Sequence, residues 1–330
     1  MKTLQYEFLL EAEQPIAHHQ ETIGNDAIAM RRRVRLPDGD FADVPVVSAD
    51  TMRHGMREAV AYAYLDAAGL LADAALSEAA LRLLFAGGMI TGKGDAGTVK
   101  LDAYRQLVDL VPSVALFGGC AGNRCIPGRL FVEDGMLVCE EQRRYLPEWA
   151  TAWLSAQGQA IETCRAHVEE VQRVRMDPSL DPGKRRLLAA SAEKAVEGRL
   201  DAGEKAATEG DAIARAESKS TMMPRRFERV VQGSLFFWRV SAHTYSALDE
   251  DTLTTALATF LYSPVVGGKK GTGHGKLRCL AARNMDVRRP AERAEEVDVR
   301  ALGSAAGSLF RTHVSERKAQ IKKLLDEIDA

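Results

Sequence analysis

The chain begins with apolar and polar residues in alternation, a pattern typical of a strand with one buried face. Between Leu4 and Glu11, the side chains of Leu4, Tyr6, Phe8 and Leu10 fall on one side. A second alternating run at 27–36 is followed by a Pro-Asp-Gly turn and by the apolar run at 41–47. We therefore expect a strand and then a hairpin.

The hydrophobic spacing then changes to the helical period. After Ser48, the apolar positions Met52, Met56, Val60 and Ala63 recur three or four residues apart, which predicts a helix with Ser48 as its N-cap. Residues 66–110 are also expected to be helical, interrupted by a glycine-containing loop at 87–100.

Strand patterns return in the second half of the chain. Two short apolar runs around Glu133-Asp134-Gly135 predict another hairpin. A strand is expected around the aromatic run 236–238, whose rings are more typical of a core than of a base-stacking platform, although an exposed ring could stack. A helix at 249–263 and an amphipathic C-terminal helix from Ser304 complete the pattern, the latter as a packing or partner face.

Composition indicates a folded protein with no spanning segment. The chain has 330 residues, 46% of them hydrophobic and 27% charged, which excludes disorder throughout and allows two units at about 150 residues each. It has no apolar run of the ~18 residues that a spanning helix needs, and no features of a signal peptide, so we expect a cytoplasmic protein.

Five cysteines are present, an odd number that fits a reducing compartment without a disulfide framework. Cys120 and Cys125 are separated by four residues, Cys139 follows, and Cys164 precedes His167 by three. None of these forms a CxxC pair, so a structural zinc site is disfavoured and no metal is expected.

The net charge of −2, from 44 basic and 46 acidic residues, excludes a generally basic coat, so polyanion contacts would need segregated patches. On a strand, Arg31, Arg33 and Arg35 would form a row about 6.6 Å apart, suited to an extended phosphate backbone. Arg53 and Arg57 lie one helical turn apart near a helix start that attracts anions, although a solvated helix face is an equal alternative.

The segment 265–278, VVGGKKGTGHGKLR, combines five glycines with three lysines and has no acid. Such loops can form a nest for phosphate oxygens, the alternative being a flexible hairpin tip. It is not a Walker A loop, because Lys276 is followed by Leu277. The spacing GxGxxG at 92–97 follows a helix-like segment, which disfavours a dinucleotide site, although Lys93 could contact a phosphate.

Catalytic residues are not evident. No GxSxG motif occurs, and the carboxylate with the best position is Asp26, whose default interpretation is a turn residue. A metal-assisted or acid-base RNA nuclease using His18, His54 or Asp26 remains an alternative, as does a nucleotide-dependent enzyme built on the glycine loops.

Three segments in order resemble the RAMP (repeat-associated mysterious protein) superfamily of CRISPR proteins. They are VPVVSADTMRHGMREA at 44–59, VPSVALFGG at 111–119 and GGKKGTGHGKL at 267–277. The resemblance spans about residues 4 to 280 and is greatest for the guide-RNA backbone subunit, within that group for the type IV systems. It implies an α+β fold with an RRM-like (ferredoxin-like) antiparallel sheet core and large helical insertions.

The implied organisation is a discontinuous RRM-like core at 1–152 and 221–290, a helical insertion at 153–220 and a C-terminal helix at 291–330. The resemblance implies a non-catalytic subunit that oligomerises head-to-tail along CRISPR guide RNA, the alternative being a RAMP-superfamily RNA endonuclease. Expected partners are guide RNA, complementary target nucleic acid, copies of the chain and other effector subunits, with no membrane partner and no cofactor. The 86–98 loop or the insertion would be the thumb that displaces a guide base.

Within this family pattern, 48–57 would be the helix entry that contacts guide phosphates and 267–276 the glycine-rich loop. Together with the basic positions noted above, the expected RNA-binding residues are Arg31, Arg33, Arg35, Ser48, Arg53, His54, Arg57, Lys93, Arg124, Arg225, Arg226, Gly268, Lys269, Lys270, Gly273, His274 and Lys276.

Overall fold

The chain forms two compact units. The computed structural model describes residues 1–23, 26–72, 76–88, 101–121, 124–176, 222–286, 295–298 and 307–328. Unit 1 comprises 1–18, 30–168 and 230–330, and unit 2 comprises 19–29 and 169–229. Residues 19–29, expected within the core at 1–152, thus group with 169–229.

An antiparallel sheet is the framework of unit 1. Its central strand β1 (Lys2–Ala12) pairs on one side with β12 (Leu235–Thr244) and on the other with β13 (Leu277–Asp286). The full order is β14-β13-β1-β12-β9-β5-β4, with β8 also on β12. The remaining strands of this sheet are β4 (Arg31–Arg35), β5 (Phe41–Val47), β8 (Leu130–Val132), β9 (Gly135–Leu137) and β14 (Glu295–Glu296).

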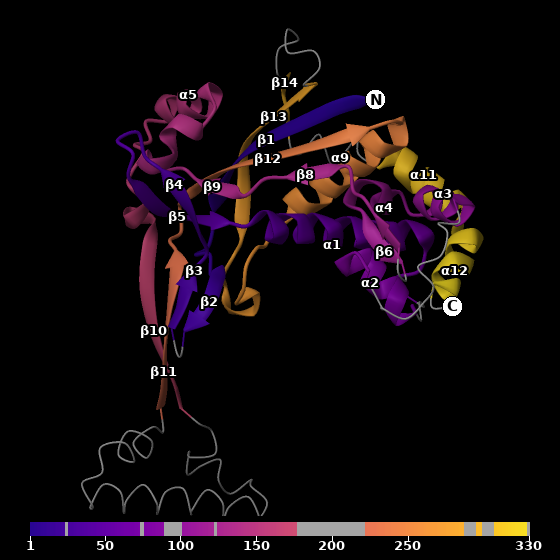
Figure 1. The fold of residues 1–330 in the computed structure, drawn as a ribbon, viewed down its shortest axis with the longest axis horizontal. Coiled ribbons are helices and arrows are strands. Elements are labelled where there is room, and N and C mark those ends of the chain that lie inside the picture. Colours follow the sequence, from indigo (N-terminus) through magenta and orange to yellow (C-terminus); the bar gives the residue numbers. More distant parts are fainter. Residues whose placement is uncertain are drawn as a thin grey trace, which may run out of the picture. The chain divides into compact units, whose positions relative to one another are not determined.

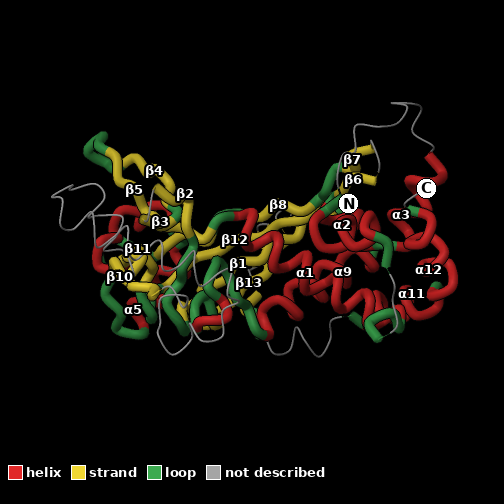
Figure 2. The backbone as a smooth tube through the Cα atoms, turned by 90° about the horizontal axis from the view of Figure 1, so that it is seen from below, coloured by secondary structure: helices red, strands yellow, loops and turns green. Residues whose placement is uncertain are grey.

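Helices cover one face of this sheet. The alternation in β1 directs Tyr6, Phe8 and Leu10 into the main core, as the sequence pattern predicted. There they meet α1 (Ala49–Ala68) and α9 (Ala247–Tyr262), which pack against each other (Figures 1 and 2). The same side holds α2 (Glu78–Ala86), α3 (Leu101–Leu110), α4 (Pro112–Phe117), α11 (Ser308–Glu316) and α12 (Lys318–Glu327).

A smaller core lies on the other face of β1. Leu9 and Phe237 pack there with Leu154 of α5 (Glu148–Ala156). Beside them the carboxylate of Glu7, only 3% exposed, accepts hydrogen bonds from Arg239 Nε at 2.9 Å and from Trp149 Nε1 at 2.6 Å. The burial of this charge is tolerated because the guanidinium and the indole N–H both satisfy it.

Helix starts agree with the sequence. Ser48 is the N-cap of α1, and its hydroxyl accepts from the amide of Thr51. Ser246 and Asp249 form a capping box at the start of α9. The aromatic run is core as expected, because Phe236, Phe237 and Trp238 are all fully buried.

The hairpin expected around Glu133-Asp134-Gly135 is wrong. Strands β8 and β9 do not pair with each other; both pair antiparallel with β12, one after the other along it. The turn-like residues make an interruption instead, because Glu133 N–H donates to the Arg239 carbonyl at 3.0 Å and Asp134 Oδ1 accepts from Ala49 N–H at 2.6 Å. The chain therefore continues along β12 at Glu133-Asp134-Gly135 and does not reverse as the pattern indicated.

The earlier hairpin is confirmed for β4 and β5, which pair antiparallel from Arg31↔Pro45 to Arg35↔Phe41. Within the described residues 307–328, the C-terminal segment forms two helices, α11 and α12, where one was expected. Their apolar residues Phe310, Val314, Ile321 and Leu325 are buried in the main core, so this face packs within the chain.

Unit 2 contains a four-stranded sheet in the order β10-β11-β3-β2. Its strands are β2 (His19–Ile23), β3 (Asp26–Ala29), β10 (Val168–Met176) and β11 (Met222–Val230), and β11 pairs parallel with β3. The expected helical insertion at 153–220 begins with the end of α5 and continues as strand β10. Its remainder at 177–220 lies outside the described residues, as does most of the proposed 86–98 thumb loop.

Backbone hydrogen bonds within unit 1 join the residues on either side of each segment that belongs to unit 2. Met30 N–H donates to the His18 carbonyl at 2.7 Å, and Val231 N–H donates to the His167 carbonyl at 2.9 Å. The α+β class with an antiparallel sheet core is confirmed, and helices packed on one sheet face fit an RRM-like core. Among the helices described, none is both long and apolar enough to cross a membrane.

Candidate nucleic-acid interface

The glycine-rich loop between α9 and β13 is tied down at its base. Gly268 N–H donates to the Ala17 carbonyl at 2.7 Å, and Gly275 N–H donates to the Pro15 carbonyl at 2.9 Å. Val266 N–H donates to the Gly275 carbonyl at 2.9 Å. The residues between these anchors, from Gly268 to Gly273, are all exposed. The loop, for which a flexible hairpin tip was the alternative interpretation, thus has a fixed base.

The glycines of this loop divide into two kinds. A Cβ on Gly275, at φ +89°, would overlap the Val266 carbonyl, and one on Gly267, at φ +73°, would lie 2.8 Å from the Ala17 carbonyl oxygen. Gly271 has neither a positive φ nor any atom within 4 Å of an added Cβ. Folding therefore requires glycine at the base, whereas at Gly271 a side chain would meet only what approaches from outside.

Two lysines and one histidine shape the tip. Lys269 has a left-handed backbone at φ 57°, and Lys270 begins a single 3₁₀ turn that ends at Thr272. Both lysines are exposed. His274 is 3% exposed, and because a carbonyl can only accept, its Nδ1–H donates to the Thr272 carbonyl at 3.0 Å. His274 supports the loop from inside, and the lysines lie outside.

The start of α1 lies next to this loop through His18. Ser48 N–H donates to His18 Nε2 at 3.3 Å, and Ser48 Oγ lies 3.0 Å from the same nitrogen. A Cβ on Gly267 would lie 3.3 Å from the Cβ of His18. We call the residues Ala17, His18, Ser48 and Gly267 to Lys276 the glycine-loop surface.

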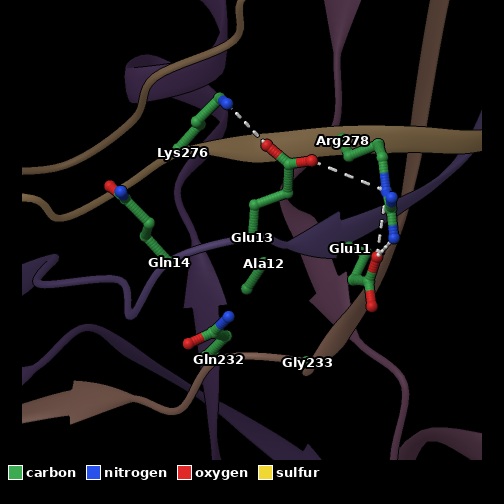
Figure 3. Close-up of a pocket in the computed structure, with 8 residues that line it drawn as sticks. All are labelled: Glu11, Ala12, Glu13, Gln14, Gln232, Gly233, Lys276 and Arg278. Carbon is green, nitrogen blue, oxygen red and sulfur yellow. Dashed lines mark hydrogen bonds and ion pairs between the residues drawn. The ribbon is translucent and has the colours of Figure 1, made fainter.

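A polar pocket of about 380 Å³ continues this surface (Figure 3). Glu13 lies between two cations there, with Lys276 Nζ 2.9 Å from Oε2 and Arg278 Nε 3.7 Å from Oε1, while Arg278 also pairs with Glu11. The hydrogen bond from Lys276 lowers the pKa of Glu13, with smaller contributions from the charges of Lys276 and Arg278. Partly exposed pairs of this kind contribute little to stability.

Arg53 and Arg57 have an internal role. Arg57 donates to the carbonyls of Phe117 at 2.9 Å and Gly118 at 3.1 Å, and Arg53 also donates to Phe117. Burial and the charge of Arg53 lower the pKa of Arg57 to about 10, so it remains protonated at neutral pH. These arginines satisfy carbonyls at the end of α4, where a cation also complements the helix dipole. The solvated-face alternative is wrong for Arg57.

The other expected site residues are spread over the molecule. On β4, Arg33 and Arg35 are exposed, Arg33 over the ring of Phe41 at 4.4 Å, and Arg31 is half-buried. Exposed His54 lies on α1. In unit 2, Arg225, Arg226 and Asp26 are exposed. Arg226 lies opposite Asp26 in the backbone register of β11 and β3, and its Nε is 3.8 Å from Glu170 Oε1. Lys93 and the side chain of Arg124 lie outside the described residues.

The structure thus joins Ser48 with the glycine-rich loop and gives Arg53 and Arg57 separate partners. Two acidic residues that contact the start of α1 or Lys276 were not predicted. Asp134 accepts from the amide of Ala49 and pairs with Arg32 at 2.7 Å, and Glu13 neutralises Lys276. Their sequence signals were a turn-like Asp-Gly pair and an acid directly after a strand, neither of which identifies a partner. Among the described residues, no group of three or more His, Cys, Asp or Glu side chains could hold a metal ion.

Comparison with known proteins gives a likeness of fold. No protein-family model matches the sequence, and no curated protein matches it. A chain of a solved "Type IV-B CRISPR Complex" aligns with 92% of this chain and 99% of that chain, with a TM-score of 0.52 and 16% sequence identity. Nearly the whole of the two chains therefore shares one α+β arrangement.

Proposed function

We propose that this protein is a non-catalytic RNA-binding subunit of a CRISPR ribonucleoprotein of the type IV class, related to the RAMP superfamily. It binds guide RNA through phosphates and assembles with further copies of itself and with other subunits. The observation that carries the proposal is the glycine-loop surface, where exposed Lys269 and Lys270 project from a loop held at both ends. A solved structure with a similar fold is a chain of a type IV-B CRISPR complex, which supports a role in a complex of this class.

The chemistry of the surface suits a sugar-phosphate chain. A fixed loop keeps its lysines in place before a ligand binds, which reduces the entropy lost on binding. Gly271 allows the ligand to approach the backbone, and Lys276 becomes available when a phosphate exchanges with Glu13. Contacts of this type are independent of sequence, as a subunit that leaves recognition to base pairing requires.

Assembly and the lack of catalysis are part of the same proposal. Copies along one RNA need a head-to-tail contact that does not close into a ring. The protein binds RNA and does not cleave it, so guide RNA incubated with the protein and Mg²⁺ should remain intact on a denaturing gel. Specific scission would replace this proposal with the nuclease alternative.

The test is RNA binding by Lys269→Ala/Lys270→Ala as a function of salt. A fluorescein-labelled single-stranded RNA is titrated with the full chain at several salt concentrations, and anisotropy gives the affinity. If both lysines contact phosphates, the slope of log K against log salt should become shallower by about 1.4, since each single-strand phosphate contact contributes about 0.7.

The control is Lys322→Ala/Lys323→Ala in α12, which removes the same charge from an exposed site on another helix. It should leave the slope unchanged. Equal slopes for the loop variant and the wild type would exclude the glycine-loop surface as the RNA site. A mass in light scattering that grows in whole copies as the RNA is lengthened tests assembly separately.

A further inference from the structure

A pair of cysteines lies face to face on a short hairpin outside the glycine-loop surface. Strands β6 (Gly119–Ala121) and β7 (Arg124–Ile126) pair antiparallel, with Cys120 directly opposite Cys125. Their sulfurs are 2.9 Å apart and both are free thiols. Cys125 is exposed and Cys120 is partly exposed, so a small molecule can reach the pair.

The backbone around the pair has the geometry that a cross-strand disulfide needs. Cys120 N–H donates to the Gly87 carbonyl at 2.6 Å and so points away from β7. Cys120 and Cys125 are therefore a non-hydrogen-bonded pair, the type in which opposed Cα atoms approach to about 4.5 Å. This separation lies within the range of about 4.4 to 6.8 Å that a disulfide spans. Little backbone movement is needed to join the sulfurs.

The other three cysteines have different surroundings. Cys139 and Cys164 are buried beside the carboxylate of Glu141, and burial, followed by the hydrogen bond to Glu141, raises both pKa values, that of Cys164 to about 11. Burial also raises the pKa of Cys279 to about 12. These thiols stay protonated and unreactive near neutral pH, because the thiolate is the nucleophile.

We propose that Cys120 and Cys125 are an oxidative modification site that closes to an intramolecular disulfide by exchange with a small disulfide of the glutathione class. The Cys125 thiolate attacks one sulfur of the oxidant, breaks its S–S bond and releases one thiolate. The Cys120 thiolate then attacks the Cys125 sulfur and releases the second. Two protein thiols lose two electrons and two protons, and one small disulfide becomes two thiols.

The hydrogen bond between the sulfurs fits this order of events. It is the main reason that the pKa of Cys120 is raised, ahead of burial and the charge of Cys125. Once Cys125 carries the mixed disulfide, Cys120 no longer faces a thiolate, so it ionises more readily and can resolve the adduct.

The β6–β7 hairpin follows the end of α4, whose carbonyls accept hydrogen bonds from Arg57. It begins directly after Gly118, whose carbonyl accepts from Arg57, and Gly88 packs so closely on Cys120 that a Cβ there would overlap its carbonyl. A disulfide between β6 and β7 therefore makes rigid the chain that follows the end of α4.

The test treats the full, reduced chain with oxidised glutathione and maps disulfides by mass spectrometry without reduction. Trypsin cleaves after Arg124, so the disulfide must join peptide 106–124 to peptide 125–129. We expect that linkage, an intact mass lower by about 2 Da, and loss of two of the five thiols. It should form at least about tenfold faster in the folded chain than in urea, because the fold holds the thiols together.

Single variants make the result specific. Cys120→Ser should stop at a lasting mixed disulfide on Cys125, and Cys279→Ser should form the linkage as the wild type does. Absence of the 106–124 to 125–129 linkage, a linkage between chains, or one that involves Cys139, Cys164 or Cys279 would each overturn the proposal.

Discussion

Arg129 and Asp249 form a two-point ion pair, with Arg129 Nη1 2.8 Å from Asp249 Oδ2 and Nη2 2.9 Å from Oδ1. The two residues are 120 positions apart, so this contact joins the segment before β8 to the start of α9. Asp249 Oδ2 also accepts from the amides of Tyr245 and Ser246. One carboxylate thus closes a long-range contact and caps a helix.

We expect Asp249→Asn to destabilise the protein by about 1.5 to 3 kcal/mol at neutral pH, the range for hydrogen bonds to charged groups. Burial alone would raise the pKa of Asp249, but Arg129 and the two amides outweigh it and hold the pKa below its usual value. Its stabilisation is therefore complete above the unfolded pKa of about 3.9 and is lost as the pH falls through the folded pKa. Urea unfolding at several pH values measures this, and the acid-side slope should be flatter in the variant.

We expect Arg57→Ala to lower the free energy of unfolding by about 1.5 to 3 kcal/mol, because the carbonyls of Phe117 and Gly118 lose charged donors. Arg105→Ala is the matched control, since that arginine is exposed and pairs with Asp102 within α3. It should change stability by less than about 0.5 kcal/mol. Unchanged stability of Arg57→Ala together with lost RNA binding would instead place Arg57 in the interface.

Two glycine substitutions should separate folding from binding. Gly275→Ala should destabilise by about 1 to 3 kcal/mol, because it combines a positive φ with overlap on Val266. Gly271→Val should leave thermal unfolding almost unchanged, because an added Cβ meets nothing within 4 Å, yet weaken RNA binding. If Gly271→Val binds RNA as the wild type does, the ligand does not approach this part of the loop.

The buried carboxylate of Glu7 should contribute more to the free energy of unfolding than the exposed carboxylate of Glu133, which pairs with the same Arg239. Glu7→Gln should cost about 3 to 5 kcal/mol, because Arg239 is left partly unpaired and an amide NH₂ faces a donor. Glu133→Gln, whose side chain is 50% exposed and also pairs with Arg239, should cost less than about 1 kcal/mol. Urea unfolding measures the free energy of unfolding of both variants. A similar decrease in the two would contradict a larger contribution of the buried carboxylate.

Periodicity predicted the elements whose burial follows from their own residues. The apolar face of β1, the capped start of α1 and the buried run at 236–238 all follow from local spacing. It failed where the decisive partner is distant. Asp134 bonds to Ala49, 85 positions away, so the Asp-Gly pair became an interruption along β12 instead of a turn.

The same limit applies to the candidate site. The glycine-rich segment was recognisable because its composition is unusual in itself. The partners of its neighbours were not, since Lys276 and Arg57 are equally basic in sequence. Lys276 pairs with the partly exposed carboxylate of Glu13, and Arg57 donates to carbonyls at the end of α4. Charge identifies which residues can contact a phosphate, and only packing decides which of them already have a partner.

The bonds from Met30 to His18 and from Val231 to His167 make unit 1 continuous across both places where its chain is interrupted. All residue pairs of the β1–β12 ladder lie outside 19–29 and 169–229, so we expect changes in the length of these segments to leave the ladder intact. Unit 1 therefore closes its own backbone at both places where the chain leaves it.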